Sequence, residues 1–317
     1  MINKKRRISI LAIVAVLFIV LYLVWGLTPK GYEYSLYLRV PRVIAIIVAG
    51  SAISLSCMLF QSVTQNRIIT PSIMGLDALY SLTQTFVVFA FGSTSFIFLN
   101  KPVNFLITCS LMLLLSMILF KLVLNGKKNN IFFLLLIGTV TGTLFRTFSS
   151  FMQVIIDPNE YDALLTKIQA SFNLVNTKIL LLVLAIVLII FVLVYEEIKK
   201  LDVISLGRDT AVNLGVNYDK FTKKMLIFVA ILVSVSTALV GPITFLGIMV
   251  INLTHELIKS YKHTELIPVS ILISVISLVG GQFIVERLLN FNSTISIIIN
   301  FVGGLYFIIL LLREGKV

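Results

Sequence analysis

The chain has 317 residues, of which 58% are hydrophobic and 13% charged, and its mean hydropathy is +1.05. Soluble domains carry about a quarter charged residues and less than half apolar ones. The composition therefore excludes a soluble enzyme, a nucleic-acid-binding protein and a disordered scaffold. It predicts an all-α integral membrane protein in which the lipid bilayer solvates most of the surface, and the formal net charge of +12 is interpreted as a topological signal.

The first predicted membrane span, residues 8–27, follows the basic cluster Lys4-Lys5-Arg6-Arg7. Its apolar stretch is longer than the roughly 7–15 residues of a signal peptide, and no small-residue cleavage site is found before Trp25, so we expect an uncleaved helix. Nine further apolar runs bring the expected number of spans to about ten, at residues 43–62, 72–91, 103–124, 131–155, 178–198, 223–240, 241–258, 266–285 and 295–312.

The distribution of basic residues predicts which side of the membrane each loop occupies. Of the 26 Lys and Arg residues, 18 fall on the side of the N-terminus, seven on the opposite side and one, Arg146, inside a span. Basic residues concentrate in cytoplasmic loops, so both termini are expected in the cytoplasm. The eighth span is less regular because Gly241-Pro242 interrupts it, and a re-entrant pair is the alternative.

We interpret residues 1–317 as a single transmembrane domain with two longer hydrophilic segments. Residues 156–177 are expected outside the cell. Residues 199–222 are expected inside, and their basic, glycine-punctuated sequence predicts a docking surface.

The fifth span is unusually polar, and polar groups inside a membrane are costly enough to be functional candidates. Helical spacing places many of them on one broad face. Close helix packing through Gly138 and Gly142 is one interpretation, but Arg146 needs an anion, water or carbonyl groups and favours a wet pathway for an anionic cargo. The candidate pathway residues are Gly138, Thr139, Gly142, Thr143, Arg146, Ser149, Ser150 and Gln153.

Other chemistry finds little support in the sequence. Asp77 is a solitary carboxylate near a helix start, where the helix dipole already favours it, and this scarcity of intramembrane carboxylates weakens an ion-coupled secondary carrier. His255-Glu256 lacks the second histidine of a zinc motif because position 259 is lysine, so no metal site is expected. A phosphate-binding loop is absent, so the chain is not expected to hydrolyse ATP, to be an enzyme or to bind a cofactor. Uphill transport would then need an energising partner.

Several segments resemble one family, the FecCD-type permeases of ABC importers for ferric siderophores, haem and cobalamin. The resemblance spans nearly the whole chain and rests on four stretches: Arg39-Val-Pro-Arg42, Asn66-Arg-Ile-Ile-Thr-Pro-Ser-Ile-Met-Gly75, Leu206-Gly-Arg-Asp-Thr-Ala-Val-Asn-Leu-Gly-Val216 and Gly241-Pro-Ile-Thr-Phe-Leu-Gly247. Residues 66–80 with Gln84-Thr85 resemble the subgroup that imports catecholate or petrobactin-like siderophores. The family's proline-histidine is replaced by Ile251-Asn252, which is typical of a divergent branch.

The resemblance implies a type II ABC importer fold and three protein partners: a second, different permease chain, a cytoplasmic ABC ATPase and an extracellular siderophore-binding lipoprotein. It places Arg39, Arg42 and Arg287 where similar permeases dock the lipoprotein. It implies that the ATPase contacts Leu206, Gly207, Arg208, Ala211, Leu214 and Gly215. A haem or cobalamin permease and a secondary carrier are the alternatives, and an intramembrane hydrolase is a weaker one.

Overall fold

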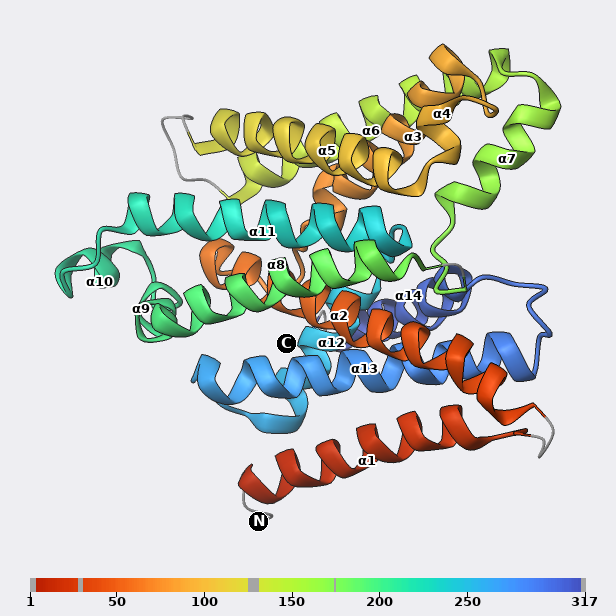
Figure 1. Cartoon of the computed structure of the whole chain (residues 1–317). Helices are drawn as coiled ribbons and strands as arrows, with labels where there is room; N and C mark the ends of the chain where they lie inside the picture. The colour runs from red at the N-terminus through yellow and green to blue at the C-terminus, as the bar shows by residue number, and fades with distance from the viewer. Residues whose placement is uncertain (1–3, 28–30, 125–130, 174, 315–317) are drawn as a thin grey trace.

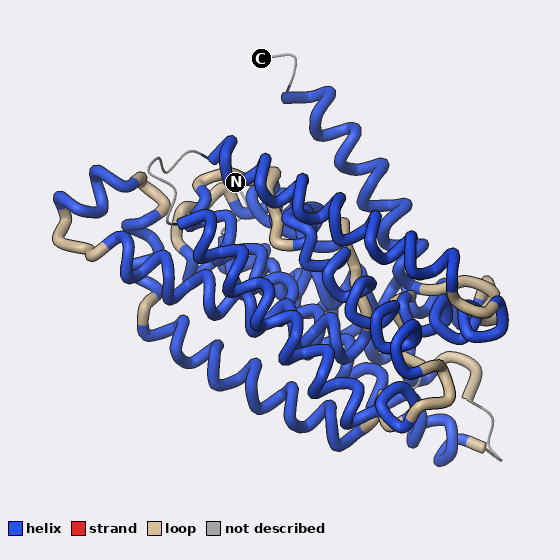
Figure 2. Tube along the Cα trace, turned by 90° about the horizontal axis from the view of Figure 1, so that it is seen from above, coloured by secondary structure: helices blue, strands red, loops and turns tan. Residues whose placement is uncertain are grey.

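The computed structural model describes residues 4–27, 31–124, 131–173 and 175–314, and these residues form helices and loops with no β-strand (Figure 2). Within that part of the chain, ten helices have 13 residues or more, and each overlaps one predicted span. They are α1 (Lys4–Val24), α2 (Tyr32–Thr64), α3 (Asp77–Phe91), α5 (Lys101–Leu124), α6 (Ile131–Ile155), α8 (Thr177–Glu196), α11 (Tyr218–Val240), α12 (Leu246–Ile258), α13 (His263–Arg287) and α14 (Ile295–Glu314).

Short helices lie at the two ends of the bundle of long helices. At one end are α9 (Ile198–Ile204) and α10 (Arg208–Asn213), and at the other are α4 (Phe96–Leu99) and α7 (Pro158–Ile168) (Figure 1). Side-chain caps set several of these boundaries. Asp157 accepts a hydrogen bond from the backbone of Asn159 at the start of α7, and Asn217 accepts one from Lys220 at the start of α11.

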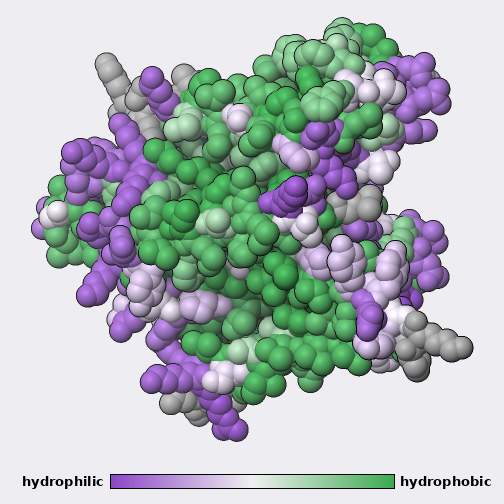
Figure 3. Space-filling view, viewed as in Figure 1, coloured by the Kyte–Doolittle hydropathy of each residue, from purple (hydrophilic) through white to green (hydrophobic). Residues whose placement is uncertain are grey.

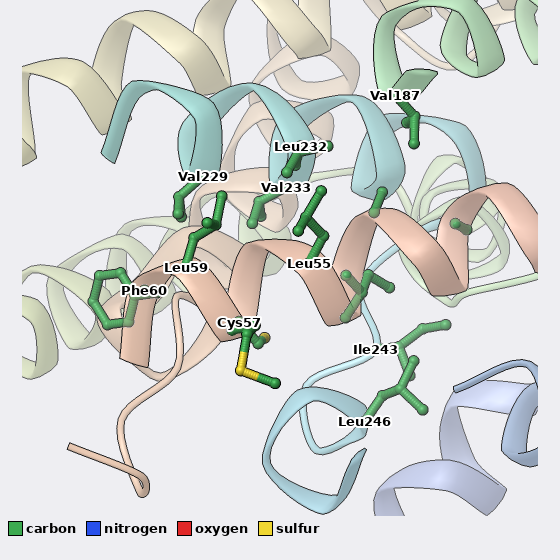
Figure 4. Packing of buried hydrophobic residues seen from close by; sticks show 14 of the residues in the cluster. Leu55, Cys57, Leu59, Phe60, Val187, Val229, Leu232, Val233, Ile243 and Leu246 are labelled. Atoms are coloured by element: carbon green, nitrogen blue, oxygen red, sulfur yellow. The ribbon is translucent and has the colours of Figure 1, made fainter. Parts of the chain in front are cut away.

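The centre of the protein is built around α2, whose 33 residues span about 50 Å. In its most apolar stretch 83% of the residues are buried, against 11% in α1 and 28% in α8, so α2 belongs to the core and the other two to the periphery. Figure 4 shows Leu55 and Leu59 of α2 facing Val229, Leu232 and Val233 of α11. The opposite side of α2 packs on α13.

The surface carries an apolar belt between two polar ends (Figure 3). Seven helices in the described residues are long and apolar enough to cross a membrane. The chain is therefore an all-helical, multi-pass membrane protein.

The structure corrects the predicted start of the second span. Helix α2 begins at Tyr32 rather than at residue 43 and continues through Pro41, so the Arg39-Val-Pro-Arg42 motif is helical. The predicted start was too late because two arginines and a proline are typical of a polar loop rather than of a membrane-spanning helix. Their charges are neutralised by groups that are distant in the sequence, as described below.

The eighth span also differs from its prediction. Residues 241–245 are not helical, and α12 has only 13 residues, about 20 Å, which is shorter than the hydrocarbon core of a bilayer. Gly241 adopts φ +94°, and a Cβ atom there would lie 2.7 Å from Cα of Ala170. A close backbone crossing therefore breaks the apolar run at this glycine.

Candidate substrate pathway and docking surfaces

Two of the predicted pathway residues, Gly138 and Gly142, pack against the π-helical turn η1 (Ser72–Leu76). A Cβ atom on Gly142 would lie 2.9 Å from Cα of Gly75, and one on Gly138 would lie 3.0 Å from Cα of Met74. These glycines let α6 and η1 approach closely, as the packing interpretation predicts.

Two further pathway residues, Ser149 and Gln153, join α6 to α3. The Ser149 hydroxyl lies 2.8 Å from the hydroxyl of Thr85, and the Gln153 amide donates to both hydroxyls at 3.1 Å. Ser149 is buried. The hydrogen-bonding groups of this cluster are paired within the bundle, because each one has a partner across the α3–α6 contact.

The remaining four pathway residues, Thr139, Thr143, Arg146 and Ser150, are exposed on the other side of α6. The single broad face predicted from helical spacing is therefore divided, because α3 and η1 cover one part of it. The exposed side carries an open groove of about 760 Å³. The groove is lined by Thr139, Val140, Thr143, Leu144, Thr147, Phe148 and Phe151.

The groove of α6 combines an apolar floor with hydroxyl groups. The Thr143 and Thr147 hydroxyls donate to carbonyl oxygens one turn earlier, at 2.8 and 3.0 Å. Their oxygens retain the capacity to accept hydrogen bonds. Such a surface tolerates water or a polar ligand better than the exposed faces of α5 and α8, whose large exposed residues are Leu106, Leu114, Met117, Ile118, Leu181, Leu182, Leu188, Ile189, Phe191, Val192 and Tyr195.

Asp77, the first residue of α3, lies near the same region. Its carboxylate accepts a hydrogen bond of 2.7 Å from Thr244, in the non-helical segment that precedes α12, and it interacts electrostatically with Arg146. The sequence showed Asp77 as a solitary acid. The fold gives it the Thr244 hydroxyl as a hydrogen-bond partner.

The predicted coupling residues form a compact protrusion around α10 (Figure 1). Gly207 and Gly215 flank the helix with φ of +110° and +82°, values that favour glycine. Ala211 is buried, while Leu206 and Leu214 are 62% and 61% exposed. Arg208 pairs with Asp219 at 3.4 Å. Two leucines are thus exposed to solvent at a polar end of the molecule.

Nearby, Glu197 ties the end of α8 to its neighbours. Lys200 and Lys224 lie 2.7 and 2.8 Å from its carboxylate oxygens, and these hydrogen bonds lower the pKa of Glu197. This ionic contact fixes the base from which the coupling protrusion extends.

The three arginines predicted to dock a binding protein gather at the opposite end, around Glu286 of α13. The carboxylate lies 3.7 Å from Arg39 Nε, 3.3 Å from Arg42 Nη1 and 3.7 Å from Arg287 Nη2. The Arg39 guanidinium also donates to the carbonyls of Tyr22, Leu23 and Trp25. The arginines therefore connect α1, α2 and α13, and their docking role stays a prediction.

Sequence reasoning named these arginines but missed Glu286 and Tyr22, whose hydroxyl donates to Glu286 at 2.7 Å. The available signal was an acidic residue next to Arg287 at the end of an apolar run. Asp202 and His263 were also missed, because 61 residues separate two groups that the fold brings into contact.

Comparison with known proteins identifies the family. The model of the FecCD transport family matches residues 5–313. The chain belongs to this family. It is 52% identical to the petrobactin import system permease protein YclO of Bacillus subtilis, over 99% of both chains, and 36% identical to the petrobactin permease FatC of Bacillus anthracis, over 87% of this chain and 78% of FatC.

Two solved structures have a similar fold. A metal-chelate type ABC transporter in an inward-facing conformation superposes with a TM-score of 0.85 at 21% identity, over 98% of this chain and 100% of that chain. PsaBC of Streptococcus pneumoniae superposes with a TM-score of 0.60 at 17% identity, covering 88% and 92%. Relatives of this chain are transport permeases, and a second permease is named in the same system as YclO or FatC.

Proposed function

We propose that this chain is the permease subunit of an ATP-driven importer that carries a ferric siderophore of the petrobactin type across the cytoplasmic membrane. The observation that carries the proposal is the 52% identity to a petrobactin permease over 99% of both chains. The exposure of Arg146 on α6 supports it, because a lipid-facing helix has no need of a charged side chain.

The proposed topology has ten spans, with both termini and α10 in the cytoplasm. The excess of basic residues on the N-terminal side supports this orientation. Helix α1 also begins toward the end of the bundle from which α10 protrudes (Figure 1). In this orientation α7 and the Glu286 cluster face the outside.

Three partners complete the proposed importer. A second, different permease chain would cover the exposed face of α6 and close the pathway, while a cytoplasmic ATPase would bind around α10. An extracellular lipoprotein would dock beside Arg42 and Arg287, whose side chains are 15% and 26% exposed, with Arg39 beneath them at 8%. Opposite charge on the lipoprotein would orient this encounter.

The function is tested by uptake measurements in cells with and without the gene. Radiolabelled iron is offered as a panel of ferric siderophores or as haem, and radiolabelled cobalamin is offered separately. Loss of uptake for petrobactin-type chelates alone, restored by the intact gene, is the expected result. Loss for haem or cobalamin would assign another substrate of the same fold. Unchanged uptake across the panel would contradict the proposal.

Replacing Arg146 with glutamine is expected to reduce transport of an anionic ferric chelate roughly tenfold, since a lost charge–charge contact of about 1.4 kcal/mol changes an equilibrium by that factor. Arg6→Gln, which removes an exposed arginine from the first turn of α1 and leaves α6 unchanged, is the matched control and should retain most transport. The measurement is siderophore uptake in proteoliposomes that contain the complete importer. Equal activity of the two variants would remove Arg146 from the pathway.

Replacing Leu206 and Leu214 together with glutamate is expected to abolish ATPase association while leaving the chain folded. The reason is that both side chains are exposed, so the charges cost little in the free chain but oppose an apolar contact. Co-purification of the ATPase measures the effect. Leu288→Glu, a residue 69% exposed at the opposite end, is the control and should co-purify normally.

A further inference from the structure

Three residues from three helices form a continuous hydrogen-bonded chain at the base of the coupling protrusion. Asp202 of α9 accepts from both the backbone nitrogen and Nδ1 of His263, at 2.8 and 2.6 Å. The other ring nitrogen of His263, Nε2, lies 2.6 Å from the hydroxyl of Ser62 in α2. A single side chain, His263, thus joins α9, α13 and α2.

The order of groups is that of a hydrolytic triad, but the surroundings are those of a structural link. His263 is 3% exposed and Ser62 7%, and the Ser62 hydroxyl also lies 2.8 Å from the carbonyl of Met58 in its own helix. A nucleophile needs access to substrate. Here the serine is enclosed between helices, so the three residues are suited to holding α9 rather than to cleaving a bond.

Other contacts reinforce the attachment of α9 to the end of α2. Gln65 donates to the carbonyl of Ile204 at 3.4 Å, and Leu201 and Ile204 are buried. Helix α9 continues through Gly207 into α10, which carries the exposed leucines. Helix α10 is therefore connected to α2 and α13 through the packed contacts of α9.

Helices α2 and α13 are also joined to each other along their length. In the middle of the bundle the Ser274 hydroxyl of α13 donates to the carbonyl of Gly50 in α2 at 3.0 Å. At the far end Arg39 and Arg42 of α2 pair with Glu286 of α13. Contacts at three levels therefore join α2 and α13 from the coupling end to the opposite end.

We propose that the Asp202–His263–Ser62 chain is the junction through which the coupling protrusion moves α2 and α13 together as a single body. His263 is a positioning residue for transport: it touches neither substrate nor nucleotide, and acts by keeping α9 in register with α13. The role in transport rests on the proposed function, whereas the rigid attachment is a property of this chain alone.

The first test uses the importer reconstituted with its partner permease and ATPase. Breaking the link with His263→Asn is expected to lower transport at least about tenfold while ATP hydrolysis stays within about twofold, because the two activities are coupled through this contact. His255→Asn, a half-buried histidine of α12 outside the link, is the matched control for this change. Ser62→Ala is paired with Ser270→Ala, whose hydroxyl donates to the carbonyl of Ile267 in its own helix at 2.8 Å. Transport that falls in proportion to ATP hydrolysis, or that survives in His263→Asn, would overturn the junction.

The second test needs no substrate and separates this inference from the proposed function. Spin labels at Lys199→Cys in α9 and Ile284→Cys in α13 occupy exposed positions, and the two native cysteines are buried. One narrow distance that ATP does not change is expected in the parent chain, and a broadened distribution in His263→Asn. A nucleotide-dependent distance in the parent, or an unchanged distance distribution in the variant, would refute the rigid link.

If His263→Asn does not assemble, the same measurements on Asp202→Asn decide the question. Failure of siderophore uptake in the parent importer would instead refute the proposed function.

Discussion

Glu286→Ala is expected to lower the free energy of unfolding by about 3–5 kcal/mol, because removing one partner of a buried ion pair leaves the other charge uncompensated. Glu286 and Arg39 are each 8% exposed, and Arg42 is 15% exposed. The alanine variant also loses the acceptor for Tyr22, so α1 loses one of its links to α13.

Thermal unfolding of the purified chain in detergent measures this loss. Cys57 and Cys109 are buried and free, so a thiol-reactive fluorophore reports the temperature at which the bundle opens. Glu265→Ala is the control, since the side chains of its pair with Lys4 are 31% and 51% exposed and such a pair is worth at most about 1 kcal/mol. Similar unfolding temperatures for the two variants would show that the arginine cluster does not stabilise the fold.

Gly75→Ala is expected to destabilise the protein by about 2–5 kcal/mol, the sum of a left-handed backbone penalty and overpacking. Gly75 adopts φ +88°, and a Cβ atom there would lie 2.5 Å from Cα of Gly142. The obstacle is backbone, so no side-chain rotation relieves it. Because η1 also leads directly into Asp77, we expect transport to be lost even where the variant inserts.

Two glycine variants calibrate this effect. Gly142→Ala meets the same contact at 2.9 Å with ordinary helical φ, so it should show only the overpacking part, about 1–3 kcal/mol. Among the described residues, a Cβ atom on Gly304 meets no atom within 4 Å beyond its chain neighbours and the adjacent backbone of its own helix, so Gly304→Ala should be neutral or slightly stabilising. If Gly75→Ala unfolds at the same temperature as Gly304→Ala, the close crossing is not under the constraint described here.

The sequence predicted the position of each long helix better than its ends. Apolar runs of roughly 20 residues are strong signals, and all ten overlap helices in the described residues. The start of α2 was missed by 11 residues because Arg39 and Arg42 count as polar in any hydropathy pattern. Only the fold reveals that Glu286 and three carbonyl oxygens compensate them.

The candidate pathway shows the same division. Polar composition singled out α6 as the candidate, and periodicity alone assigned glycines, serines and Arg146 to one face. The observed packing separates them: Gly142 and Ser149 contact η1 and α3, while Thr143 and Arg146 remain exposed. A helix has one periodicity and several neighbours, so the pattern cannot say which neighbour covers which side chain.

By itself, the sequence determined the solvent of this protein, its helical class and its family, because these depend on composition, run length and local motifs. The tertiary structure alone decided which charges are compensated and which helices pack against one another. The deciding pairs lie far apart in the chain: 247 positions separate Glu286 from Arg39, 61 separate Asp202 from His263, and 167 separate Asp77 from Thr244. Contacts at such separations arise from the packing of whole helices, and each pair becomes favourable only after the bilayer and the bundle have excluded water from it.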